Sequence, residues 1–293
     1  MKKIVFVFCL VLVFVGCHNR ENIVDKQELL ARDFRLFQHT PAWELAKAVQ
    51  DEEVDAIEEE VTKQAVDPNF REPKYGGTLL MLAIYNAKYR STKTLLALGA
   101  DPNLGDTYKG ESAMIDAAEN KDIRYLRLLL AYKGNPNAVE NAYSTGKNSV
   151  RSTPLNAAIS SLSCDGLEKV RLLVEAGANV NYARDDDEGF TRLPLAEALL
   201  LKRMEIVLYL LENGADYTSV LYTTVNNKKV YILEDLRKCR FELDSKEHTT
   251  KKKIILFLKT RKLSYENEPI PDYILKEIQR EYPLDWKDYI KKY

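Results

Sequence analysis

Hydrophobic positions along the chain fall into pairs of short blocks with helical spacing, separated by polar turns and loops. The first block of a pair carries small residues, as in Ala113–Ala118, and the second is rich in leucine, as in Leu95–Leu98. Spacings of three and four residues place such side chains on one face of a helix. The pattern therefore predicts two-helix units that bury their apolar faces against one another.

The leucine-rich blocks end in a repeated phrase, of which Gly-Ala-Asp-Pro-Asn at Gly99–Asn103 is the clearest copy. The last asparagine of the phrase recurs every 34 residues, at Asn69, Asn103 and Asn137, and the next steps are 44 residues to Asn181 and 37 to Thr218. A period near 34 is typical of helix-pair repeats. The longest step combines an oversized loop, Ala138–Ser152, with an insertion at Ser160–Gly166.

The first helix of each unit has its own signature. Thr78, Ser112 and Thr153 offer a hydroxyl to the free N–H groups at a helix start, and Pro154 and Pro194 occupy the first helical position. With the Gly-Ala-Asp-x-Asn phrase, the copies Thr153-Pro-Leu-Asn-Ala-Ala158 and Leu193-Pro-Leu-Ala-Glu-Ala198 resemble the ankyrin-repeat family. The resemblance implies an all-α solenoid of helix pairs with projecting finger loops and helical caps, which works by binding.

Two departures from the family pattern affect local structure. The family's histidine after Thr-Pro-Leu is replaced by Met81, Ile115, Asn156 and Ala196, so its turn-stabilising hydrogen bond is expected to be missing. Lys133-Gly134 stands where the other units have Gly-Ala, which predicts a distorted helix end there.

The family pattern covers residues 67–218. Residues 41–66 read as an N-terminal helical cap, 219–265 as a degenerate fifth repeat with a polar loop at Ser245–Lys253, and 266–293 as two C-terminal capping helices. In the last pair, we expect four side chains to face inward: Ile274, Ile278, Trp286 and Ile290.

The N-terminus is a separate element. Lys2-Lys3 precede an apolar run, Ile4–Val15, that is too short to remain as a membrane span, so residues 1–16 read as a signal peptide. The following Gly16-Cys17 resembles a bacterial lipobox, with Phe14 in place of the usual leucine. The resemblance implies lipid on Cys17. Ordinary signal-peptidase cleavage and a retained anchor helix are the alternatives.

The region after the lipid, residues 17–40, reads as a mostly polar tether in which Gln27–Gln38 could form a helix. Lipid would hold the protein at a membrane surface. His18 follows the cysteine in place of the aspartate that retains many lipoproteins at the inner membrane. By that resemblance we expect an outer-membrane lipoprotein facing the periplasm.

Charge and cysteine content narrow the function. Removing the signal peptide changes the formal charge from −1 to −3. This mildly acidic charge argues against a nucleic-acid-binding protein, which would need a basic surface. Of the four cysteines, Cys164 and Cys239 are the two that lie neither in the signal peptide nor at the predicted lipidation site. They fall in units that are two stacking steps apart, beyond the reach of a disulfide, so we expect both to be buried or half-buried thiols.

No catalytic or metal constellation is evident, and neither an enzyme nor a cofactor is expected. The three histidines, His18, His39 and His248, lack cysteine or histidine partners at ligand spacing. The carboxylates of Asp185–Glu188 are consecutive, unlike those of a calcium loop, and indicate a solvated loop tip or a contact with a basic partner. Lys251–Lys253 similarly reads as solvated or in contact with acidic lipid or a partner.

The finger loops carry aromatic side chains interleaved with charged ones, the composition of interface hot spots. These loops and the inner helices resemble the surfaces that ankyrin proteins use for binding. The candidate partner-binding residues are Phe70, Arg71, Tyr75, Tyr108, Tyr143, Arg151, Arg184, Asp185, Asp186, Asp187, Glu188 and Phe190.

The sequence thus predicts an exported, lipid-anchored array, monomeric when free, that binds a partner protein. By analogy with small ankyrin-type lipoproteins, the partner is expected to be a toxin, such as a phospholipase-like effector of type VI secretion, which the array neutralises as an immunity protein. The alternative is an envelope scaffold that holds a protein complex together.

Overall fold

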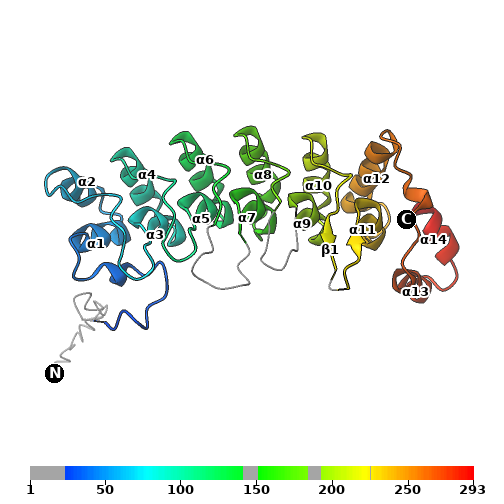
Figure 1. Ribbon diagram of the computed structural model, residues 1–293, viewed down its shortest axis with the longest axis horizontal. Coiled ribbons are helices and arrows are strands. Elements are labelled where there is room, and N and C mark those ends of the chain that lie inside the picture. The colour runs from blue at the N-terminus through cyan, green and yellow to red at the C-terminus, as the bar shows by residue number, and fades with distance from the viewer. Residues whose placement is uncertain (1–23, 141–150, 184–192, 225) are drawn as a thin grey trace, which may run out of the picture.

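In a computed structural model of the protein, described for residues 24–140, 151–183, 193–224 and 226–293, the chain forms two parallel rows of helices (Figure 1). Each helix pair packs beside the next, as expected for a solenoid. The inner row consists of α1 (Trp43–Asp51), α3 (Leu79–Tyr85), α5 (Ala113–Glu119), α7 (Pro154–Ser160), α9 (Pro194–Leu200) and α11 (Ile232–Lys238). The outer row consists of α2 (Val54–Thr62), α4 (Tyr89–Ala97), α6 (Ile123–Ala131), α8 (Gly166–Glu175), α10 (Met204–Glu212) and α12 (Lys246–Lys259).

The expected all-α class is confirmed. The described strands are a single hairpin before α11, in which β1 (Tyr222–Thr223) pairs antiparallel with β2 (Lys229–Val230). Two 3₁₀ turns, η1 (Phe34–Phe37) and η2 (Tyr265–Asn267), flank the array, and α13 (Asp272–Glu281) and α14 (Trp286–Lys292) close it.

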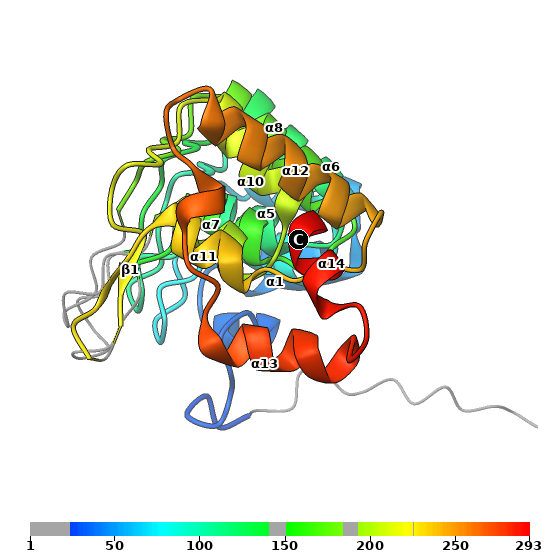
Figure 2. The ribbon, with the colours of Figure 1, turned by 90° about the vertical axis from the view of Figure 1, so that its right-hand side faces the viewer.

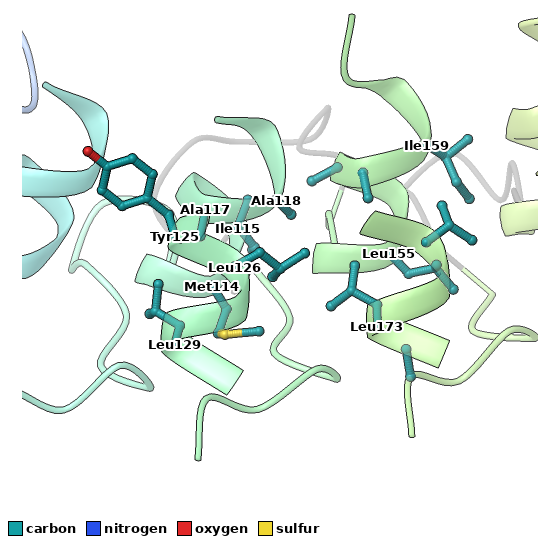
Figure 3. Packing of buried hydrophobic residues seen from close by; sticks show 14 of the residues in the cluster. Met114, Ile115, Ala117, Ala118, Tyr125, Leu126, Leu129, Leu155, Ile159 and Leu173 are labelled. Atoms are coloured by element: carbon teal, nitrogen blue, oxygen red, sulfur yellow. The ribbon is translucent and has the colours of Figure 1, made fainter. Parts of the chain in front are cut away.

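One apolar core runs between the rows through every helix pair (Figure 3). Ala117 and Ala118 of α5 are fully buried, and their small size lets the inner helices pack closely. Leu126 and Leu129 of α6 fill the space between the rows. Each such leucine contributes about 1.5–3 kcal/mol by leaving water, so the array is stable only when the units are stacked.

The repeated asparagine clamps each unit to the next one. Asn103 donates from Nδ2 to the carbonyl of Lys133 at 3.2 Å and accepts from the Asn135 N–H at 2.6 Å. The same pair of bonds is made by Asn69, Asn137 and Asn181, each to the following unit. The phrase therefore recurs because one side chain satisfies two backbone groups across every repeat junction.

The expected distortion at Lys133-Gly134 is absent. Lys133 takes the left-handed conformation, with φ of 64°, that Gly99, Gly177 and Gly214 take in the other units. Gly134 fills the place of the usual alanine, because a Cβ there would lie 2.3 Å from Sδ of Met114. The helix end keeps its geometry, and Lys133 bears the strain.

The C-terminal carbonyls of the inner helices are satisfied by side chains from outer helices or from the next unit. Lys169 of α8, fully buried, donates to the Ala118 and Asn120 carbonyls at the end of α5. Arg203 donates a hydrogen bond to the Ser161 carbonyl after α7. Lys251 donates to the Cys239 carbonyl after α11, at 2.8 Å. The cost of burying these basic side chains is offset by the hydrogen bonds that they make to carbonyl groups that would otherwise be unpaired.

Several expectations of local structure were wrong. Ser245–Lys253 is the first half of α12, capped by the Ser245 hydroxyl, and His248 and Lys251 are buried in it. Cys164 is exposed because it lies in the inserted connection between α7 and α8, whereas Cys239 is buried and both thiols are free. In the third unit Thr153 bonds the backbone N–H and side chain of Asn156, so the expected missing turn bond is replaced there.

The closing helices form a small second core. Ile274 and Ile278 are buried as expected, but Trp286 and Ile290 are only half-buried, and Tyr289 and Tyr293 take the buried positions. Helix α13 lies on the side of the inner row opposite the outer helices (Figure 2). Within the described residues, no helix combines the length and apolarity that crossing a bilayer requires.

Candidate protein-binding face

The candidate binding surface is the inner face, which we define as the exposed side of α3, α5, α7 and α9, the one or two residues just beyond their C-terminal ends, and the finger loops that precede these helices. The first two fingers extend from the N-terminal ends of α3 and α5, as Figures 1 and 2 show. Isolated antiparallel bridges, Arg71 with Thr78 and Gly105 with Ser112, hold the bases of the first two fingers. These two fingers are thus fixed at their bases to the helices that follow them.

The first two fingers carry four of the predicted partner-binding residues. Arg71 and Tyr108 are exposed, whereas Phe70 and Tyr75 are half-buried. The Tyr75 and Tyr108 rings meet edge to face with centroids 5.7 Å apart, and Phe70 packs on Phe37 at 6.3 Å. Part of this aromatic surface therefore stabilises the molecule itself.

The third and fourth fingers are described only in part. Arg151 is half-buried at the end of the third finger. The remaining predicted residues lie outside the described residues: Tyr143, Arg184, Asp185, Asp186, Asp187, Glu188 and Phe190, as does the predicted lipidation site Cys17.

The segment expected to be a tether folds onto the inner face in its described part. Residues 24–40 make a turn and η1 in place of the suggested helix, and Leu36 and Phe37 are buried against the first cap. Lys74 donates to the carbonyls of Gln27 and Leu29, both at 2.8 Å. A mostly polar composition concealed this docking, because it depends on backbone carbonyls and a few buried side chains.

Arg32 of that segment is buried in a group of three carboxylates, which we call the acidic site: Asp106, Glu111 and Asp116. Its guanidinium lies 3.1 Å from Asp116, 3.5 Å from Asp106 and 3.7 Å from Glu111, and its side chain is 6% exposed. Asp106 also accepts three backbone N–H bonds within its own finger, from Tyr108, Lys109 and Gly110. The finger and α5 thus hold the site together.

The acidic site extends along α5 to the next finger. Burial raises the pKa of Asp116 to about 8, although Arg32 lowers it, and Glu111 raises it further. Desolvation also raises the pKa of Glu119, and the carboxylates of Glu111 and Glu140 add to this effect. Part of both shifts comes from repulsion between neighbouring carboxylates, which a basic group of a partner would relieve.

Exposed apolar side chains lie beside these carboxylates. The last residues of α3, α5, α7 and α9 form a row, Tyr85, Glu119, Ser160 and Leu200, and Tyr85 is 65% exposed. Leu162 and Leu201, just beyond the ends of α7 and α9, are also exposed, at 95% and 44%. Large apolar groups that leave water on contact are the usual anchors of a protein interface.

Sequence reasoning missed the central residues of this face. Arg32 was placed in a tether, and Asp116 was read as part of an ordinary inner helix. The available signal was the carboxylate in Ala113-Met-Ile-Asp-Ala-Ala118, at a position where α3 has Leu82 and α7 has Ala157. A charge in an otherwise apolar helix indicates a buried partner.

The described residues show no arrangement for metal chemistry. Among them, no three His, Cys, Asp or Glu side chains gather in a way that could hold a metal ion. His248 Nδ1 accepts the Asp244 N–H at 3.0 Å, and its Nε2 lies 2.9 Å from the Lys292 carbonyl, so this imidazole joins α12 to α14.

Comparison with known proteins bears on the fold. Residues 131–220 match the family model for ankyrin repeats, in three copies. Comparison with curated proteins gives no match. Ankyrin repeats generally mediate protein–protein interaction, and proteins built from them are typically non-enzymatic binding scaffolds. Stacked helix pairs and this match together show that the chain carries ankyrin repeats and folds as an all-α ankyrin-repeat solenoid.

Proposed function

We propose that this protein is an envelope-anchored immunity lipoprotein that binds a secreted toxin through its inner face and neutralises it. The observation that supports binding is the combination, on one face, of the neighbouring carboxylates around Glu119 with exposed Tyr85 and Leu162. Apolar anchors supply affinity, and carboxylates select a basic partner and speed its approach.

The immunity role rests on architecture and on the sequence. An array of this kind can cover an active site by shape, because its surface is long and its first two fingers are fixed at their bases. The lipobox-like Gly16-Cys17 would keep it at the membrane, where a phospholipase-like effector of type VI secretion would act. An outer-membrane location facing the periplasm is part of the same proposal.

Competition between sibling strains tests the immunity role. Cells that lack the protein should be killed by a sibling that delivers the toxin, and the wild-type gene should restore survival. A variant with Tyr85→Ala and Glu119→Lys should fail to restore it at equal protein levels. Unchanged survival of the deletion strain would contradict immunity and favour the envelope scaffold.

Metabolic labelling with an alkyne fatty acid tests the anchor separately. Wild-type protein should take up label and sediment with membranes, and Cys17→Ala should lose both properties. Labelling that persists in Cys17→Ala would place the lipid elsewhere, and no labelling of wild type would exclude lipidation.

A further inference from the structure

The acidic site already holds one occupant, the N-terminal arm, which we define as residues 24–32. Most contacts to the arm reach its backbone: Lys74 bonds two of its carbonyls, and the Tyr75 hydroxyl donates to the Leu29 carbonyl at 3.0 Å. Asn86 donates to the Arg32 carbonyl at 3.1 Å. Such contacts fit any segment whose backbone follows the same path and depend little on its sequence.

Side-chain recognition is concentrated at Arg32. Its guanidinium faces three carboxylates within 3.7 Å, and Gly77 leaves room for it, because a Cβ there would lie 3.3 Å from Nη1. A planar guanidinium can face several carboxylates at once, whereas a lysine ammonium acts as a point charge. The site therefore suits arginine better than lysine.

The arm is an imperfect occupant. Arg32 has φ of 70°, a left-handed conformation that is strained for a residue with a Cβ. Its buried Nε has no hydrogen-bond partner among the described residues. Two residues before it, the Leu30 side chain is 79% exposed, so this side chain gains little from burial. An extended segment without these costs could use the same contacts with a better net free energy.

We propose that the acidic site is a receptor for an arginine side chain of the partner protein, and that the N-terminal arm occupies it until an arginine-bearing extended segment of the partner replaces it. This inference rests on the proposed function, since it names the chemistry by which the inner face recognises its partner. In the free protein the arm covers the carboxylates. Weakly basic ligands therefore bind the acidic site with a lower apparent affinity.

A peptide with the sequence of residues 24–33, labelled with fluorescein, serves as the probe, and its counterpart with alanine in place of Arg32 is the control. Fluorescence anisotropy measures binding to the whole chain and to its Arg32→Ala variant, in which the arm competes less. The arginine peptide should bind Arg32→Ala at least about tenfold more tightly than wild type. Asp116→Asn, added to Arg32→Ala, should abolish that gain.

Hydrogen exchange on the same proteins separates local release from misfolding. In Arg32→Ala, residues 24–32 should lose protection, while the helices from α1 to α12 keep theirs. Equal binding of the two peptides, equal binding to wild type and Arg32→Ala, or no binding at all would overturn the proposal. A failure to find a toxin would leave these results unchanged, so the two proposals fail separately.

Discussion

At the scale of single residues, the repeat tolerates a strained exception when packing demands it. Lys133 takes the left-handed conformation that glycine takes at the equivalent helix ends, and the glycine is shifted to position 134, where it lies against Met114. Replacing Lys133 by glycine removes the Cβ strain, and we expect the free energy of unfolding to rise by about 1 kcal/mol. Urea denaturation measures this change. Gly134→Ala is the matched control and should destabilise; a less stable Lys133→Gly would contradict the account.

Lys251 makes stability depend on pH. Burial lowers its pKa from 10.5 to about 7, with the ammonium position 3.8 Å from the centre of the Tyr293 ring. Between these two pKa values the unfolded chain holds a proton that the folded chain lacks, so stability rises with pH. From pH 7 to 9 we expect a gain of about 1 kcal/mol per pH unit from this group.

Comparison with Lys251→Met isolates that contribution. Urea unfolding at pH 7, 8 and 9 should show a smaller rise for the variant than for wild type. Above pH 9 the buried Cys239 thiol acts in the opposite direction, because burial raises its pKa to about 11. Identical slopes for the two proteins between pH 7 and 9 would mean that Lys251 is charged in the fold.

At the scale of elements, the asparagine clamps decide how units are joined. Asn103→Ala removes one donor to Lys133 and one acceptor for Asn135, and water replaces them in part. We expect a loss of about 1–2 kcal/mol in the free energy of unfolding. Asn103→Asp, which keeps the acceptor, should lose less. Equal stability of Asn103→Ala and wild type would show that the leucine core alone sets the register.

The distance along the chain between interacting residues explains which elements the sequence could and could not predict. Inner helices were found because Thr78 and Pro154 mark their starts, and helix ends because Gly99 and Gly177 mark them; these signals are local. Arg32 was missed because its partner Asp116 lies 84 positions away in the chain. The start of α12 was missed because His248 and Lys251 are polar residues, and polar residues usually indicate a loop. Their burial is evident only in the folded structure.

At the scale of the whole molecule, the two ends of the chain limit the inner face. The N-terminal arm lies over the first units and α13 lies near the last, both on the side away from the outer helices (Figures 1 and 2). Between them, α5, α7 and α9 present the row of exposed residues that includes Glu119 and Leu200. A partner that engages the middle of the array therefore meets acidic and apolar groups together.

The central claim is that the partner binds this inner face. Two variants of matched composition test it: Tyr85→Ala, Glu119→Lys and Leu162→Ala change the inner face, and Tyr132→Ala, Glu175→Lys and Leu256→Ala change the outer side. All six side chains are exposed, so both variants should fold.

The measurement is calorimetric titration of each variant with the partner isolated on the wild-type protein from cells that produce it. The inner-face variant should bind at least about a hundredfold more weakly than wild type, and the outer-side variant should bind within about twofold of it. Full affinity in the inner-face variant, or a loss confined to the outer-side variant, would contradict the account.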